Sequence, residues 1–211
     1  MTFFLTLISG IGWMIVYEEC IRLGFKEKTY AMPFWALGLN FAWELIYTVA
    51  DILYEAHGPL IGMNLAQAVV NAIWVCMDLV ILFTYFRYGK KEWADISSQK
   101  WFYPWSILGI VCCFMLQGVF IKEFGFIMAA QYSAFLQNLL MSVLFIHMHR
   151  IRRGRSGQSL LLAVSKWIGT LAPTILMGVI HYNAMVLVCG IFCSVFDILY
   201  IAVLLLDKNS N

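Results

Sequence analysis

Glu44, Asp78 and Asp197 are carboxylic acids in stretches of sequence that are otherwise strongly apolar. If these stretches are helices rising about 1.5 Å per residue, the three acids lie roughly 20, 12 and 14 Å from one end of their helices. An ionised side chain at the centre of a membrane costs at least about 2.5–3.5 kcal/mol, which makes such residues functional candidates. Because burial disfavours the charged carboxylate, an acid at this depth is expected to keep its proton and to donate it to an apolar substrate.

Further polar residues accompany these acids at helical spacing. The three predicted faces contain Asn40, Glu44, Tyr47 and Asp51; Gln67, Asn71, Trp74 and Asp78; and Ser194, Asp197 and Tyr200. Steps of three and four residues place each set on one side of a helix, which must face inward because lipid cannot satisfy polar groups. For Asn40, Asn71, Gln137 and Asn138, hydrogen bonding between helices explains the pattern as well as a functional role does. Asp51 fits a solvated carboxylate at a helix end equally well.

Aromatic side chains neighbour the acids, and their π faces can stabilise a cation. They are Trp43, Tyr47, Trp74, Phe196 and Tyr200. The same residue types also populate membrane interfaces, so the aromatic residues alone do not distinguish a cation-stabilising site from an interface. We expect no Lys or Arg at the depth of Glu44 or Asp197, since Lys166 lies near the end of its stretch, where it can reach the interface. An acid with aromatic neighbours favours carbocation chemistry, and the sequence leaves open which acid donates first.

Composition indicates the class of protein that positions these residues. Of the 211 residues, 62% are hydrophobic and 12% are charged, whereas roughly a quarter are charged in soluble domains. Apolar runs of about 20 residues are typical of membrane-spanning helices. The sequence predicts an all-α membrane protein, a single seven-helix transmembrane domain over residues 1–211. The predicted spans are 2–19, 31–51, 66–86, 102–121, 126–147, 160–181 and 184–206.

The charge distribution predicts an orientation. Basic residues gather in 20–30, 87–101 and 148–159 and in the C-terminal tail, whereas the opposite side receives only Lys122. The positive-inside rule therefore predicts an outside N-terminus and a cytosolic C-terminus. Basic loops on a chain of net charge +2 suit a lipid surface rather than nucleic acid. The expected location is the endoplasmic reticulum in a eukaryote or the cytoplasmic membrane in a bacterium, and the oligomeric state stays open.

The sequence predicts no metal site and no disulfide framework. Five of the six cysteines lie within predicted spans, where a cysteine is usually a small polarizable core residue. No His/Cys group has ligand spacing, and the chain lacks the runs of clustered aspartates that hold magnesium in cyclases acting on allylic diphosphates. This pattern favours a reaction that begins by protonation.

Several segments resemble, in order, the integral-membrane terpene cyclases of meroterpenoid and indole-diterpene biosynthesis. The run "RLGFKEKTYAMPFWALGLNFAWELIYT" is similar to that family's second-span region, and "NAIWVCMDLVILFTYFRYG" to its third span. The segments "QNLLMSVLF", "KWIGT" and "FDILY" resemble its fifth, sixth and seventh spans. Together the segments cover essentially the whole chain.

The resemblance implies cyclisation of a farnesyl- or geranylgeranyl-type chain that carries an aromatic or other polar head and often a terminal epoxide. It implies that Glu44 and Asp197 are the essential acids of an intramolecular lyase or isomerase. The product is then an isomer of the lipophilic substrate, so no redox cofactor is expected. Asn40, Asn71 and Asp78 are candidates for orienting the acids or holding the polar head.

A small seven-span proton-coupled transporter is the alternative, because intramembrane carboxyl groups also relay protons in carriers. Against it, the sequence has no internal repeat and no matched pair of Pro- or Gly-broken helices, and only Pro173 lies deep in a span. A closed or one-sided cavity between the second, third and seventh spans would favour the cyclase over a path with two gates.

Overall fold

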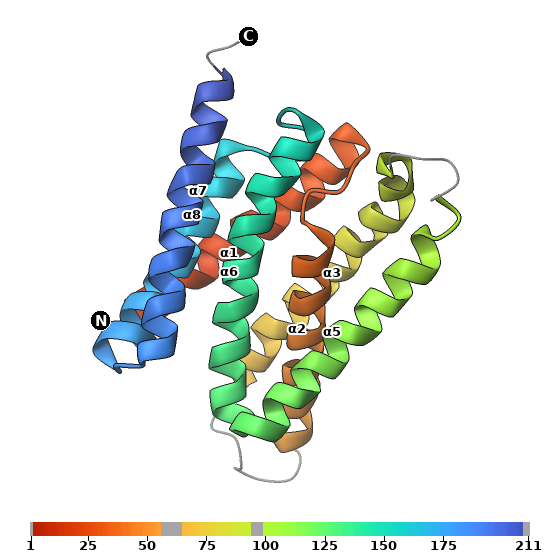
Figure 1. Ribbon diagram of the computed structural model, residues 1–211. Helices are drawn as coiled ribbons and strands as arrows, with labels where there is room; N and C mark the ends of the chain where they lie inside the picture. Colours follow the sequence, from red (N-terminus) through yellow and green to blue (C-terminus); the bar gives the residue numbers. More distant parts are fainter. Residues whose placement is uncertain (1, 56–64, 94–98, 209–211) are drawn as a thin grey trace.

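The computed structural model describes residues 2–55, 65–93 and 99–208, and these residues form helices and no strand (Figure 1). The side chain of Asp51 and that of Gln67 lie outside the described residues. The elements are α1 (Thr2–Glu27), α2 (Phe34–Glu55), α3 (Leu65–Tyr88), the short η1 (Gly89–Glu92), α5 (Phe102–Phe124), α6 (Phe126–Arg152), α7 (Leu160–Pro173), η2 (Thr174–Ile180) and α8 (Ala184–Lys208). The seven predicted spans correspond to the long helices in order, with η2 continuing α7.

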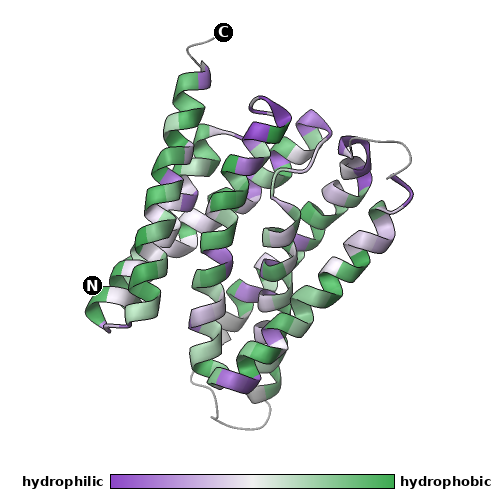
Figure 2. Ribbon diagram, in the orientation of Figure 1, coloured by the Kyte–Doolittle hydropathy of each residue, from purple (hydrophilic) through white to green (hydrophobic). Residues whose placement is uncertain are grey.

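Six of these helical segments are long and apolar enough to cross a membrane: α1, α3, α5, α6, α7 with η2, and α8. Figure 2 shows hydrophobic residues along most of their length and hydrophilic residues gathered towards the ends of the bundle. Large apolar side chains such as Phe3, Leu116 and Phe192 point outward and are at least half exposed, as lipid-facing residues must be. The chain is a multi-pass membrane protein. The helix α2, which carries Glu44, is not among the six.

The contacts of α2 explain how a less apolar helix fits this bundle. It packs against α3, α5 and α6, and Asn40, Glu44 and Thr48 on it are buried. Helix α8 packs instead against α6, α7 and η2. One apolar core nevertheless draws buried residues from all seven long helices, from Val16 in α1 to Leu204 in α8. Glu44 and Asp197 therefore sit on helices whose main neighbours have only α6 in common.

Helices α1 and α7 cross closely because small residues meet at the crossing. A Cβ atom added to Gly12 would lie 2.9 Å from the Cα of Gly169, so the two backbones approach as in other small-residue crossings of membrane helices. Pro173 lacks an N–H group and cannot bond to the carbonyl of Gly169 one turn earlier. The hydroxyl of Ser9 donates to that carbonyl at 2.9 Å. The crossing thus compensates for the proline within α7.

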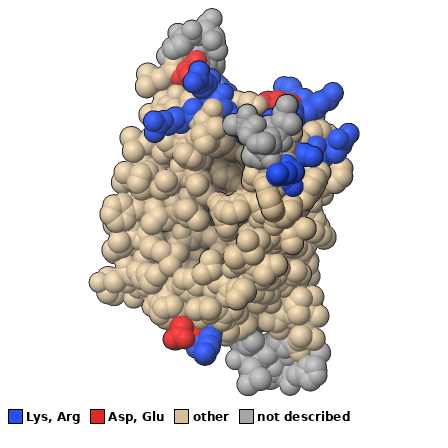
Figure 3. Space-filling view, turned by 45° about the vertical axis from the view of Figure 1, so that its right-hand side comes forward, with Lys and Arg blue, Asp and Glu red and all other residues tan. Residues whose placement is uncertain are grey.

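Side-chain bonds tie the helices together at the basic end of the bundle. Arg152 at the end of α6 donates twice to Glu92 of η1, at 2.7 and 2.9 Å, and Thr29 also donates to Glu92. The backbone N–H of Gly157 donates to Glu27 at 2.7 Å. Figure 3 shows Lys and Arg gathered at this end, little charge at the other, and a hollow in the surface just below the basic end.

Candidate active site

Glu44 lies at the centre of a buried hydrogen-bonded cluster made by three helices. The hydroxyl of Tyr17 from α1 donates to Glu44 Oε1. Asn40, one turn earlier on α2, donates from Nδ2 to the same oxygen at 3.0 Å and also to the Tyr17 hydroxyl. All three side chains are at most 8% exposed. The apolar interior therefore holds one carboxyl group between a phenol and an amide.

Asp78 of α3 is the second carboxyl group of this cluster. Asn40 Nδ2 lies 3.3 Å from Asp78 Oδ2, and Asp78 is fully buried. Asn40 Nδ2 lies 3.0 Å from an oxygen of Glu44 and 3.3 Å from one of Asp78, so the two carboxyl groups are close enough to repel each other when both are charged. Two carboxyl groups in this relation favour a state in which at least one keeps its proton.

Two glutamines extend the cluster towards α5 and α6. Gln137 donates to Asn40 Oδ1 at 3.2 Å, and Gln117 donates to Gln137 Oε1 at 3.0 Å. These bonds use the carbonyl oxygen of Asn40 and so direct its Nδ2 towards the carboxyl groups. For Asn40 and Gln137 the sequence favoured neither a structural nor a functional role. In the structure both belong to the hydrogen-bonded surroundings of Glu44. Asn138 contributes no described bond from its side-chain Oδ1.

An aromatic wall and several unpaired polar atoms surround the two acids. The indole of Trp74 stacks on the Tyr17 ring with centroids 6.1 Å apart and planes 7° from parallel. Among the described residues, four buried atoms near the acids have no hydrogen-bond partner: Glu44 Oε2, Asp78 Oδ1, Thr48 Oγ1 and Trp74 Nε1. Buried polar atoms are nearly always paired in proteins. Here they provide both donors and acceptors beside the carboxyl groups.

Asp197 belongs to a separate cluster. Lys166 Nζ of α7 donates to its two oxygens at 2.8 and 3.0 Å and to Ser142 Oγ of α6 at 2.7 Å. Lys166 is completely buried and Asp197 is 1% exposed. The expectation that no basic residue faces Asp197, and that Lys166 reaches the interface, is wrong. Sequence reasoning measured the depth of Lys166 along its helix but could not see that α6 and α8 cover it.

Asp78, and not Asp197, is the carboxyl group beside Glu44. Whether Glu44 or Asp197 acts on a substrate stays a prediction.

The other predicted site residues lie in three places. Asn71 is fully buried on α3, one turn before Trp74. Trp43 and Tyr47 lie before and after Glu44 on α2, where Trp43 Nε1 donates to the carbonyl of Ala130 at 3.0 Å and the Tyr47 hydroxyl to that of Phe126 at 3.4 Å. On α8, Tyr200 is buried and donates to Gln158 at 2.7 Å, whereas Phe196 is half-buried.

Sequence reasoning missed Tyr17, Lys166 and Ser142. Tyr17 is the only tyrosine of α1, and a single tyrosine is typical of both cores and interfaces. Lys166 gave a usable signal, since it lies six residues inside the predicted span 160–181. A basic residue at that depth could have been matched to a carboxyl group of another span.

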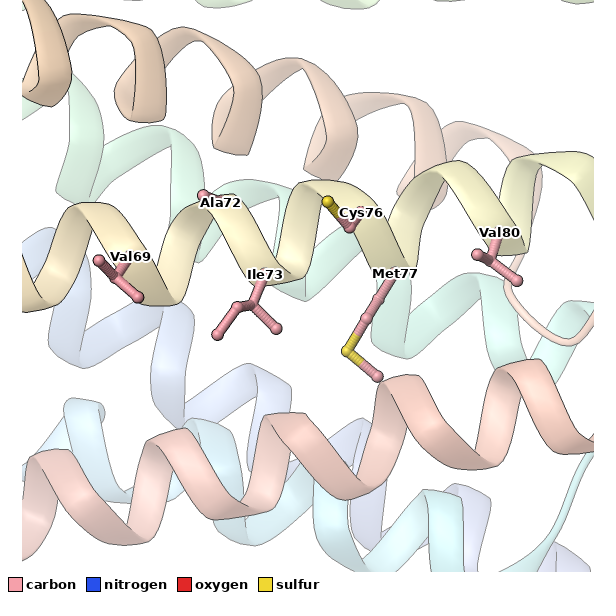
Figure 4. Close-up of a pocket in the computed structure, with 6 residues that line it drawn as sticks. All are labelled: Val69, Ala72, Ile73, Cys76, Met77 and Val80. Carbon is pink, nitrogen blue, oxygen red and sulfur yellow. The ribbon is translucent and has the colours of Figure 1, made fainter.

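A groove of about 450 Å³ runs along the outer face of α3 and is lined by Val69, Ala72, Ile73, Cys76, Met77 and Val80. Figure 4 shows these side chains coming from α3 alone, with Met77 directed towards the neighbouring helix. None of them is a polar group suited to acid catalysis, and most belong to the exposed side of the helix. This groove, open along α3, is not the expected cavity between the second, third and seventh helices.

Comparison with known proteins agrees with the resemblance in the segments above. The family described as Pyr4-like transmembrane terpene cyclases matches residues 1–208. Terpene cyclase pyr4 of Aspergillus fumigatus is 26% identical over 209 residues, covering 94% of this chain and 83% of the relative. The Pyr4-family terpene cyclase mfmH of Annulohypoxylon moriforme is 25% identical, covering 85% and 71%.

Terpene cyclase terB of Tolypocladium album is 28% identical, covering 79% of this chain and 66% of the relative. No solved structure matches the chain. An all-helical, multi-pass fold and a family match over nearly the whole length lead to one conclusion. The chain belongs to the Pyr4-like transmembrane terpene cyclases.

Proposed function

We propose that this membrane terpene cyclase closes rings in a prenylated substrate by protonating it, without a metal ion, and guiding the resulting carbocation. The observation that carries the proposal is the buried position of Glu44 among Tyr17, Asn40 and Asp78. In an apolar interior a carboxylic acid keeps its proton, and because water is largely excluded, the alkene or epoxide of a bound substrate is the acceptor within reach. The substrate class is a farnesyl- or geranylgeranyl-type chain, with or without a terminal epoxide.

The ion pair between Lys166 and Asp197 gives Glu44 and Asp197 different roles. Lys166 holds Asp197 as a carboxylate, because the ammonium group contacts both of its oxygens. An acid held in its charged form cannot be the first donor. Glu44 is therefore the donor, and Asp197 is the base or the counter-ion for a positive charge late in the reaction. Asp78 is the neighbouring carboxyl that favours the protonated state of Glu44.

The surroundings of Glu44 suit the acceptor of the proton. Glu44 Oε2 and Trp74 Nε1, both without a partner among the described residues, can each donate to an epoxide oxygen when Glu44 is protonated. The stacked rings of Trp74 and Tyr17 offer π faces to the cation that forms as the epoxide opens. Internal alkenes then attack in sequence, and loss of a proton ends the reaction.

This chemistry defines the reaction class. The proton that is added is balanced by the proton that is lost, so the product is an isomer of the substrate and no redox cofactor takes part. Among the described residues no group of three His, Cys, Asp or Glu side chains is arranged as metal ligands. The cluster consists of hydrogen-bond donors facing two carboxyl groups, which supports acid–base catalysis by an intramolecular lyase or isomerase. The transporter alternative gains no support from the family match.

We also propose seven membrane crossings with the N-terminus outside and the C-terminus in the cytosol. The ends of the bundle support this, since Lys and Arg gather at one of them and the two termini lie towards opposite ends (Figures 1 and 3). The membrane is that of the endoplasmic reticulum in a eukaryote or the cytoplasmic membrane in a bacterium. Cysteines introduced as Glu123→Cys and Ser156→Cys test the orientation in intact bacterial cells that carry the protein in their cytoplasmic membrane. An impermeant maleimide should label the first at once and the second only after permeabilisation, and the reverse order would contradict the proposal.

The function is tested by incubating membranes that contain the protein with prenylated compounds, each supplied with and without a terminal epoxide. Wild-type protein should convert at least one into an isomer of equal mass. Glu44→Gln and Asp197→Asn should both abolish conversion, whereas Glu123→Gln, an exposed acid at the end of α5, should not. Unchanged cyclisation by both acid variants would refute the mechanism.

A further inference from the structure

We infer that the turn between α6 and α7 binds the phosphate group of an anionic phospholipid through Arg155 and Gln158. This site lies apart from the acid clusters and does not depend on the reaction. It begins with a cation that lacks a partner: Nε and Nη2 of Arg155 are buried, and neither has a hydrogen-bond partner among the described residues. A buried donor without a partner costs free energy, and it costs more when it is charged. An anion from outside the chain can supply that partner.

Two other arginines at the basic end of the bundle show what this edge of a guanidinium group binds. Arg22 donates from Nε and Nη2 to the two carboxylate oxygens of Glu19, at 2.6 and 2.7 Å. Arg152 donates from the same two atoms to Glu92 Oε2, at 2.9 and 2.7 Å. This edge matches the oxygens of a carboxylate or a phosphate. In Arg155 it is the edge without a partner.

The carboxylates around the turn are paired with other donors. Glu19 also accepts from the Ser159 hydroxyl at 2.6 Å, and Glu27 accepts from the backbone N–H of Gly157 at 2.7 Å. Within the described part of the chain, Arg155 takes part in no ion pair. The positive charge of Arg155 is therefore not matched by a neighbouring side chain, which favours a ligand that carries negative charge.

Gln158 adds a neutral donor next to this cation. Residues 155–158 form a β-turn, in which the N–H of Gln158 donates to the carbonyl of Arg155 at 2.8 Å. The first and last Cα atoms of such a turn lie within about 7 Å of each other. Gln158 is 3% exposed, and its Oε1 accepts from the Tyr200 hydroxyl at 2.7 Å. Its Nε2, which is buried and has no partner among the residues described, is thus left as a third donor for a phosphate.

The surroundings of the turn favour a lipid phosphate over a free anion. Ile151 before the turn and Leu161 after it are 64% and 55% exposed, so side chains suited to hydrocarbon stand on both sides of the donors. Lys and Arg gather at this end of the bundle (Figure 3). Ser156 is exposed and Arg155 is half-buried, so a phosphate can reach the guanidinium from the side of Ser156 after a change of rotamer. Basic sites of this kind between membrane helices bind anionic head groups.

The test measures lipid binding by native mass spectrometry of the purified protein in detergent, with phosphatidylglycerol as the probe. Arg155→Gln should weaken phosphatidylglycerol binding by about tenfold or more, because a hydrogen bond to a charged group is worth that factor. Arg150→Gln is the matched control, since Arg150 is exposed at the end of α6 and its loss changes the net charge equally. The Kd of this control should stay within about threefold of the wild type. Neither phosphatidylcholine nor an excess of inorganic phosphate should displace the phosphatidylglycerol.

A second variant supplies the missing partner from within the chain. Gln158→Glu places a carboxylate beside the Arg155 guanidinium and keeps an acceptor for Tyr200. It should bind phosphatidylglycerol more weakly by about tenfold or more. In detergent without lipid, it should unfold at a higher temperature than the wild type because the guanidinium is then paired. This variant also decides the question if Arg155→Gln does not fold.

Four results would overturn the inference. They are unchanged binding in Arg155→Gln or Gln158→Glu, an equal loss in Arg150→Gln, displacement by phosphatidylcholine or inorganic phosphate, and no gain of stability in Gln158→Glu. Displacement by inorganic phosphate would assign the donors to a free anion instead of a lipid. None of these measurements requires cyclisation, so they test the lipid site even if no prenylated compound is converted.

Discussion

Replacing Lys166 by methionine removes the cation that faces Asp197 and keeps a side chain of similar length on α7. In the wild type, Lys166 Nζ is 2.8 Å from Asp197 Oδ1, and the two side chains are 0% and 1% exposed. Water therefore cannot replace the lost partner. Breaking one side of a buried ion pair costs about 3–5 kcal/mol in free energy of unfolding. For a protein of this size that corresponds to a Tm lower by roughly 6–20 °C.

Removing the opposite charge as well should restore part of the stability lost in Lys166→Met. Asp197→Asn removes the opposite charge, so Lys166→Met combined with Asp197→Asn leaves no uncompensated ion in the interior. The double variant should be more stable than either single variant, with a coupling free energy of about 2 kcal/mol or more. A lysine that merely filled space would give additive losses. The coupling thus reports the ion pair itself.

Thermal unfolding of purified protein in detergent, followed by circular dichroism, measures these differences. Lys122→Met is the matched control because Lys122 is exposed at the end of α5, and it should be close to wild type. If Lys166→Met were as stable as Lys122→Met, or if the double variant lost the sum of the two single losses, the pairing of Lys166 with Asp197 would be refuted.

Two further substitutions test the surroundings of the acid and the packing of its helix. Tyr17→Phe removes the donor to Glu44 but keeps the ring that stacks on the neighbouring indole, so we expect kcat to fall by about tenfold or more with little change in KM, measured with any substrate the wild type cyclises; an unchanged kcat would show that the phenol does not support the acid. Gly12→Ala forces a Cβ to within 2.9 Å of the Cα of Gly169 and should cost about 1–3 kcal/mol in unfolding free energy. Gly10→Ala, which meets nothing within 4 Å, should cost much less, and equal losses in the two variants would contradict the close crossing of α1 and α7.

Hydropathy and spacing predicted the helices and the inward direction of their polar faces. Both signals are local: an apolar run determines that a segment is a helix in lipid, and steps of three and four determine which residues share its inner face. Glu44, Asn40 and Asp78 are buried together as that logic requires. The ordered family segments added the reaction class, which spacing alone could not supply.

The partner of each acid could not be predicted in this way. Which helices contact one another depends on how all seven helices pack, and the sequence of one helix does not show which others lie beside it. Tyr17 of α1 reaches Glu44 of α2 because both helices lie against α3. In the sequence, 27 residues separate Tyr17 from Glu44. Lys166 reaches Asp197 because α7 and α8 pack side by side. Depth in the membrane identified the acids, and only the three-dimensional arrangement identified their partners.

The central claim is that Glu44 supplies the proton in the chemical step, and binding and turnover of one substrate test it together. With a prenylated substrate that the wild type cyclises, Glu44→Gln should bind with a Kd within about threefold of wild type yet form product at least about a hundredfold more slowly. Intact substrate should then be recovered from the variant by mass spectrometry. Turnover by Glu44→Gln at the rate of the Glu123→Gln control would contradict the account.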